Sequence, residues 1–178
     1  MDLSYKQKTT KAAAYIIITA LAALIQNTQG LTIEIGGARC FLLIPVCVIL
    51  AMGEDERFGA LIALFGGLLW DLTSAVHLGF NAIFLCIMCF FGASLVTYIF
   101  RNIFLTNFIY SVMAIMLYCL LYWLFFIIFP NIKGAELSLF SFYLPSGIYT
   151  IAATPIIYFS LKPLKKALNK PIKYLTDN

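Results

Sequence analysis

The stretch GGLLWDLTSAVHLGFNA, from Gly66 to Ala82, interrupts a nearly continuous series of apolar segments with an acid, a histidine and three glycines. Asp71 is the residue that needs an explanation. A carboxylate near the middle of a membrane costs about 2.5–3.5 kcal/mol, and much less at the membrane boundary. The way in which the chain accommodates this acid therefore constrains the fold on both sides of it.

The composition indicates an integral membrane protein. Of the 178 residues, 62% are hydrophobic and 11% are charged, and no polar segment is long enough for a water-facing domain. The net charge of +4 comes from lysines and arginines beside apolar segments, which is typical of topology signals and not of a nucleic-acid surface. The five cysteines are odd in number and mostly lie inside apolar runs, so neither a disulfide framework nor a zinc site is expected.

The apolar segments predict an all-α polytopic bundle of about six transmembrane elements. A span needs roughly 20 apolar residues, and the second and third elements are shorter than that. They are either spans of a thin membrane or a hairpin that does not cross fully. The six elements are expected near residues 10–27, 40–53, 58–72, 81–100, 104–129 and 139–161.

The distribution of lysine and arginine predicts the orientation. With six elements both termini lie on one side, and that side carries ten of the basic residues, whereas the other side carries only Arg39 and Lys133. The positive-inside rule then places both termini in the cytoplasm.

The last segment, residues 162–178, is expected to be a basic amphipathic cytoplasmic tail. Leucines and isoleucines recur at near-helical spacing with lysines between them, which favours a tail on the inner leaflet over a nucleic-acid arm. The expected membrane-surface residues are Lys162, Lys165, Lys166, Lys170 and Lys173.

Two rows of small residues predict close helix packing. Gly59, Ala63 and Gly67 are four residues apart and share one helical face, and Asp71 continues the row. The next element carries a similar row at Cys89, Ala93 and Thr97. We therefore expect these two helices to pack against each other in antiparallel directions, with Asp71 at the outer end and turned away from lipid.

The turn between these helices offers partners for the acid. Asn81 is expected to cap the following helix, and Asp71 to accept hydrogen bonds from Thr73, Ser74 or the free N–H groups at that helix start. Asp71 is accordingly interpreted as an architectural carboxylate and not as a catalytic one.

The remaining reactive residues favour no enzyme, metal or cofactor. His77 is the only histidine and has no acidic or thiol neighbour in its turn, so it is interpreted as a loop residue. Cys86 and Cys89 have the CxxC spacing but lie inside an apolar run, where packing is the expected role. Neither a nucleophile with an adjacent base nor a second acid within a span is found, so an enzyme is not expected.

The quoted stretch, extended to GGLLWDLTSAVHLGFNAIFLCIMCFFGASLV, resembles the signature region of the MreD family of bacterial rod-shape-determining membrane proteins. That family shows a Gly-Leu-Leu-x-Asp run, a short turn, a Leu-Gly pair and a helix of small residues. The resemblance extends to chain length, number of spans and the basic C-terminal tail. The positions that match it are Gly67, Leu68, Leu69, Asp71, Leu72, Leu78, Gly79, Asn81, Ala82 and Gly92. The expected motif and turn residues are Gly66, Leu69, Asp71, Leu78, Gly79 and Asn81.

The resemblance implies a structural role. MreD-like proteins bind MreC, a bitopic protein, and work with a RodA-type glycosyltransferase, a penicillin-binding transpeptidase and, indirectly, MreB filaments. It also implies the fold of the substrate-binding S components of energy-coupling-factor vitamin transporters. Such a transporter role is the alternative function, although the outer loops offer few polar groups for a vitamin.

Overall fold

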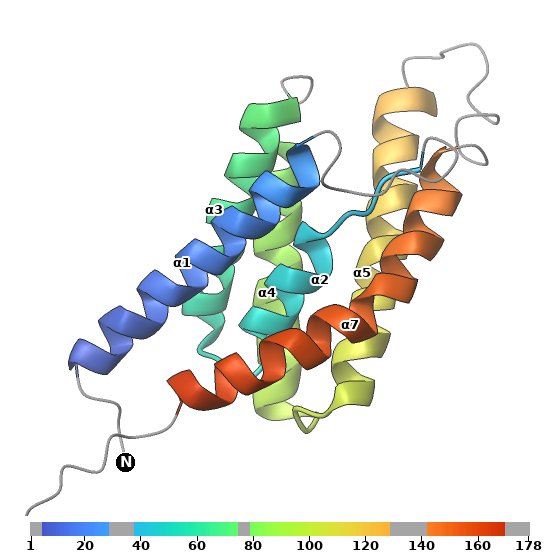
Figure 1. The fold of residues 1–178 in the computed structure, drawn as a ribbon. Helices are drawn as coiled ribbons and strands as arrows, with labels where there is room; N and C mark the ends of the chain where they lie inside the picture. Colours follow the sequence, from blue (N-terminus) through green and yellow to red (C-terminus); the bar gives the residue numbers. More distant parts are fainter. Residues whose placement is uncertain (1–4, 29–37, 75–78, 129–141, 170–178) are drawn as a thin grey trace, which may run out of the picture.

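Helices account for most of the chain that the computed structural model describes, which comprises residues 5–28, 38–74, 79–128 and 142–169. Figure 1 shows that successive helices run in alternating directions, so α1 begins and α7 ends at the same end of the bundle. This arrangement agrees with an even number of elements. The helices are α1 (Tyr5–Asn27), α2 (Leu43–Ala51), α3 (Glu56–Ser74), α4 (Phe80–Tyr98), α5 (Phe104–Trp123), the π-helix η1 (Leu124–Ile128) and α7 (Leu144–Leu168).

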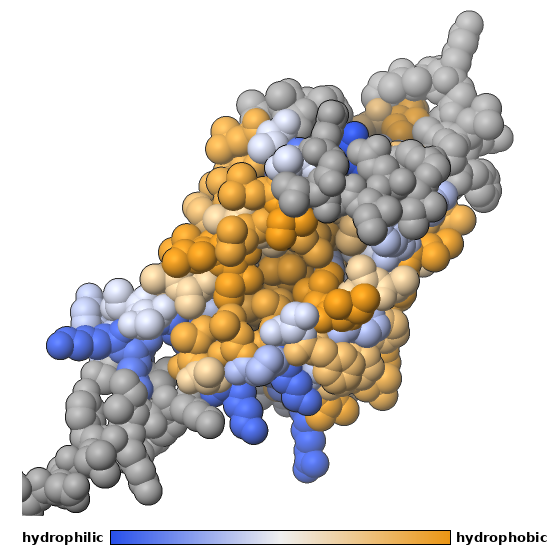
Figure 2. Space-filling view, viewed as in Figure 1, coloured by the Kyte–Doolittle hydropathy of each residue, from blue (hydrophilic) through white to orange (hydrophobic). Residues whose placement is uncertain are grey.

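The predicted all-α membrane bundle is confirmed, but six separate spans are not. Within the described residues, four helices are long and apolar enough to cross a membrane: α1, α4, α5 together with η1, and α7. Figure 2 shows a broad apolar band across the molecule, with most of the hydrophilic residues below it and a smaller group above it. An apolar band of this kind is what contact with lipid requires.

The second element is a core helix and not a span. α2 has 9 residues, all of them buried, and is therefore only about 13 Å long. It packs against α1, α3, α4, α5 and α7. The apolar run at 40–53 is short because its helix is enclosed by other helices and does not need to match the membrane thickness.

The ends of α2 are satisfied by side chains from two other helices. The Gln26 amide oxygen on α1 accepts the N–H of Leu43 at 2.8 Å, while the Lys165 ammonium on α7 donates to carbonyls at the other end, including Leu50 O at 3.0 Å. A short helix in the interior leaves free N–H and C=O groups that water cannot reach. α1 and α7 thus hold α2 in place by polar contacts as well as by packing.

The chain that leads into α2 lies against a row of hydroxyl groups on α7. The N–H of Arg39 donates to Ser146 Oγ at 3.0 Å, and the N–H of Phe41 donates to Thr150 Oγ1 at 2.9 Å. Thr154 continues the row and is also buried. These hydroxyls provide the partners that non-helical backbone requires when it is buried in a membrane protein.

The last helix is longer than expected. α7 continues past Leu161 to Leu168, so the first residues of the expected tail are the final turns of this helix. Residues 170–178, with Lys170 and Lys173, lie outside the described residues, as do residues 139–141 at the expected start of the sixth element.

Candidate functional site

Asp71 lies near the C-terminal end of α3 and holds the beginning of α4. Its side chain is buried, with 1% exposed. Among the described residues it accepts backbone hydrogen bonds from the N–H groups of Gly79 at 3.0 Å, Asn81 at 3.2 Å and Ala82 at 3.0 Å. Because a helix N-terminus carries free N–H groups and a partial positive charge, a carboxylate is stabilised there. The expected bonding to the helix start is therefore confirmed.

The cap of α4 differs from the expected one. The N-cap residue is Gly79, with φ of 96°, a left-handed conformation that glycine adopts without steric cost. The Asn81 side chain does not cap the helix, because its amide oxygen accepts a hydrogen bond from Tyr118 on α5 at 2.9 Å. Asp71 supplies the cap from another helix, and this leaves Asn81 to connect α4 with α5.

Replacing Asp71 with asparagine should destabilise the fold without abolishing it. An amide keeps one acceptor oxygen but places an NH₂ group against one of the three N–H donors and removes the charge. We expect a loss of about 1–2 kcal/mol in the free energy of unfolding, measured by denaturant titration in detergent micelles.

Asp55→Asn is the matched control, because Asp55 Oδ1 also accepts backbone N–H groups, those of Arg57 at 3.0 Å and Phe58 at 3.3 Å, but at an exposed position. Asparagine and aspartate cap helices about equally well, so this variant should be near neutral. Equal losses in both variants would contradict a special role for the buried carboxylate.

The small-residue row of α3 meets two helices. A Cβ atom on Gly59 would lie 2.9 Å from Ala51 Cβ at the end of α2, whereas one on Gly67 would lie 2.4 Å from Ala82 Cα in α4. Ala63 between them is fully buried. Gly66 faces α1, because a Cβ atom added to it would lie 2.6 Å from Thr19 Cγ2.

The second row was predicted only in part. Cys89 and Ala93 are buried, but Thr97 is exposed and its hydroxyl donates to the carbonyl of Ala93 at 2.9 Å in its own helix. The expectation that Thr97 packs against a helix was wrong, because the last turn of α4 is not covered. Gly92 makes the close contact instead, since its Cβ would lie 2.8 Å from the Tyr110 ring.

A cavity of about 240 Å³ opens beside the Asp71 turn. Half of its lining residues are aromatic, among them Trp70 and Tyr118, whose ring centroids are 5.1 Å apart. Polar groups also face it, among them Arg39 and Asn81. Asn27 lines the cavity as well, and its buried amide nitrogen has no hydrogen-bond partner in the described structure. Aromatic and arginine side chains around a recess are typical of binding sites.

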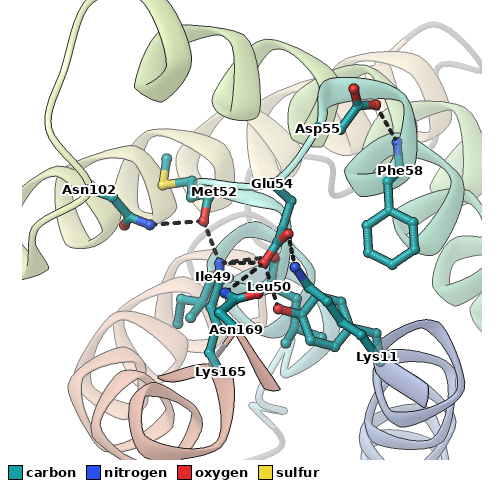
Figure 3. Close-up of polar contacts among 11 residues, drawn as sticks. Lys11, Ile49, Leu50, Met52, Glu54, Asp55, Phe58, Asn102, Lys165 and Asn169 are labelled. Carbon is teal, nitrogen blue, oxygen red and sulfur yellow. Dashed lines mark hydrogen bonds and ion pairs between the residues drawn. The ribbon is translucent and has the colours of Figure 1, made fainter. Parts of the chain in front are cut away.

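The opposite end of the bundle contains a polar cluster centred on Glu54, in the turn between α2 and α3 (Figure 3). Its carboxylate forms an ion pair with Lys11 of α1 and accepts a hydrogen bond from the Tyr15 hydroxyl at 2.8 Å. From α7, Asn169 donates to it at 3.3 Å, and the Lys165 ammonium lies 4.0 Å away. Glu54 therefore connects the first and last helices to the turn after α2.

Lys165 is not a membrane-surface residue, contrary to the expectation. Its ammonium donates to the carbonyls of Ile49 at 2.8 Å and Leu50 at 3.0 Å, and also to that of Met52. Figure 3 shows the side chain turned inward toward these groups. Free carbonyls at a helix C-terminus attract a cation, and this attraction explains the inward position. Lys162 and Lys166 are exposed.

Sequence reasoning missed the Glu54 cluster. Lys11 was interpreted only as a topology signal, although it precedes Tyr15 by four residues and so shares a helical face with it. That spacing was the available signal. Leu69, a motif residue that lies within α3, packs against the core, whereas Leu78 and His77 lie outside the described residues.

The fold and its two polar clusters define a polytopic helical membrane protein whose buried acids connect helices to one another. The family model described as rod shape-determining protein MreD matches residues 7–167. The chain therefore belongs to the MreD family, as the resemblance predicted, and a role in rod shape determination follows. No curated protein and no solved structure matches the chain.

Proposed function

We propose that the protein is a non-enzymatic scaffold of the bacterial cell-elongation machinery, located in the cytoplasmic membrane with both termini in the cytoplasm. It binds an MreC-like bitopic partner and supports lateral peptidoglycan synthesis by a RodA-type glycosyltransferase and a penicillin-binding transpeptidase, with MreB filaments as indirect partners. Family membership over residues 7–167 supports the cell-shape role.

The orientation is supported by the positions of the charges. The start of α1 carries Lys6, Lys8 and Lys11, and the last turns of α7 carry Lys162 and Lys166. These two helix ends are at the same end of the bundle (Figure 1). The positive-inside rule assigns that end to the cytoplasm. The Asp71 turn and its cavity then face the outer side, where the extracytoplasmic part of a bitopic partner is available.

The aromatic cavity beside Asp71 is the observation that carries the scaffold proposal. Hot spots in protein interfaces are enriched in tryptophan, tyrosine and arginine around a desolvated pocket, and this cavity contains all three residue types. The unpaired amide nitrogen of Asn27 adds a hydrogen-bond donor. Asp71 itself is engaged by the start of α4, so it shapes the cavity wall and does not serve as a reactive group.

The transporter alternative gains no support from the comparisons. The family model covers most of the chain, and no solved structure matches that would show an S-component fold. Tight binding of a vitamin to the purified protein, or its assembly with an ATPase module, would favour that alternative over the scaffold.

Depletion of the protein should make rod-shaped cells round and should remove the MreC-like partner from affinity pull-downs. The sharper test is Asn27→Ala, which removes a donor that has no partner in the described structure and so should leave stability nearly unchanged. Loss of one hydrogen bond across an interface should weaken partner capture by roughly two- to tenfold.

Thr28→Ala is the control for this test. Thr28 is the next residue, is exposed, and donates only within its own helix end, to Leu24 O at 2.7 Å. Unchanged cell shape after depletion, together with failed capture of the partner by the wild-type protein, would contradict the scaffold proposal. If the two variants captured the partner equally well, the cavity would not be part of the interface.

A further inference from the structure

A second cavity, of about 270 Å³, lies at the basic end of the bundle. It is formed where the turn between α4 and α5, the end of α2 and the last turns of α7 meet. No Asp or Glu is among the described residues that line it. Its polar lining consists of Asn102, Asn107, Lys162, Lys165, Lys166 and Asn169.

Four of these residues occupy one face of α7. Lys162, Lys165, Lys166 and Asn169 follow the spacing i, i+3, i+4 and i+7, which places them in one stripe of the helix. Like charges at such spacing repel each other and destabilise a helix. Glu54 lies 4.0 Å from Lys165 and balances that charge. An anion held between Lys162 and Lys166 would remove the repulsion that remains, so this part of the stripe has the character of a binding site.

The polar residues of the cavity differ in whether their side chains already have hydrogen-bond partners. Lys165 is engaged by the carbonyls of α2, and Asn102 donates to Met52 O at 3.0 Å. In contrast, Lys162 and Lys166 are exposed, and neither is ion-paired with a carboxylate of the described residues. The ammonium of Lys162 lies 5.7 Å from the centre of the Tyr158 ring, which keeps it beside the cavity.

The elements that form the cavity also carry exposed apolar residues. The exposed fraction exceeds one half for Ile156 and Phe159 on α7, and for Ile99, Phe100 and Ile103 near the turn between α4 and α5. At this end of the molecule the apolar band gives way to hydrophilic residues (Figure 2). The cavity is therefore at the depth where lipid head groups meet acyl chains.

We propose that this cavity binds the phosphate of an anionic membrane lipid, with Lys162 and Lys166 as the direct donors. Basic pockets between transmembrane helices on the cytoplasmic side bind lipid head groups by this chemistry. The exposed apolar residues of α7 and of the α4–α5 turn contact the acyl chains, which a soluble phosphate lacks. The lipid site is formed by α7 and the α4–α5 turn. It lies at the opposite end of the bundle from the cavity beside Asp71.

The test compares lipid binding by the full-length protein and by two double variants of equal charge. The protein is reconstituted in nanodiscs of phosphatidylcholine, phosphatidylglycerol is added, and bound lipid is counted by native mass spectrometry. Lys162→Gln with Lys166→Gln should weaken phosphatidylglycerol binding on the order of tenfold. Lys6→Gln with Lys8→Gln removes the same charge from exposed positions of α1 and should change it less than about twofold.

The possible outcomes decide between the sources of the phosphate. Preference for phosphatidylglycerol over phosphatidylcholine that is lost only in the α7 variant supports the proposal. Equal loss in both double variants would overturn it, since the attraction would then be a general effect of surface charge. Displacement of the lipid by inorganic phosphate at equal concentration would also overturn it and would assign the cavity to a soluble anion.

Discussion

Replacing Glu54 with alanine is expected to lower the free energy of unfolding by about 3–5 kcal/mol, because it leaves buried cations without their counter-charge. The side chains of Glu54 and Lys11 in this ion pair are only 7% and 10% exposed. The substitution also removes the acceptor of the Tyr15 hydroxyl. Denaturant unfolding in mixed micelles, or the amount of folded protein in the membrane, measures the effect.

Glu56→Ala is the matched control for Glu54→Ala. It deletes the same side chain two residues further on, in the first turn of α3, where an acid gains only from the helix dipole. We expect a loss of at most about 1 kcal/mol there. If the free energy of unfolding fell by the same amount in both variants, Lys11 and Lys165 would have other partners. The cluster would then not be central to the fold.

A double-mutant cycle identifies the source of the loss. Lys11→Met in the Glu54→Ala background removes one of the stranded cations, so the double variant should be more stable than the sum of the two single losses predicts. Residues that share a polar network commonly show coupling of about 0.5–3 kcal/mol. Strict additivity would mean that Lys11 and Glu54 act independently.

The small-residue row and the role of Asp71 could be predicted because both follow from local spacing. Gly59, Ala63 and Gly67 share a helical face whatever the remainder of the chain does. Asp71 follows on that face, a few residues before a helix start that needs acceptors. Such patterns involve neighbouring residues only, so the sequence contains all the information that they require.

The Glu54 cluster could not be predicted in the same way. Lys11 and Glu54 are 43 residues apart, and Asn169 is 115 residues from Glu54, so their meeting depends on how the whole bundle packs. The buried position of α2 has the same origin. An apolar run of this length fits a short span or a buried helix equally well, and only the neighbouring helices decide between them. Lys165 was assigned to the membrane surface for lack of that information.

Replacing Gly67 with alanine should be among the most destabilising single-methyl changes in the protein. The added Cβ would lie 2.4 Å from Ala82 Cα and 2.6 Å from both Ala82 N and Asn81 O. These are backbone atoms, so α3 and α4 must move apart, and the bonds from Asp71 to the start of α4 must lengthen. We expect a loss of about 3 kcal/mol in the free energy of unfolding, despite the gain of up to about 1 kcal/mol from helix propensity.

Gly147→Ala provides the comparison for Gly67→Ala, because it makes the same chemical change in a buried helical position of α7. Its Cβ would lie 3.5 Å from Cys119 Sγ and 3.7 Å from Ile115 Cγ2, which are ordinary contacts. The helix propensity gain should then make this variant neutral or slightly stabilising. Equal unfolding free energies for the two variants in the same detergent would show that α3 and α4 separate at little cost. In that case the close approach at Gly67 could not be what positions the Asp71 turn and the aromatic cavity beside it.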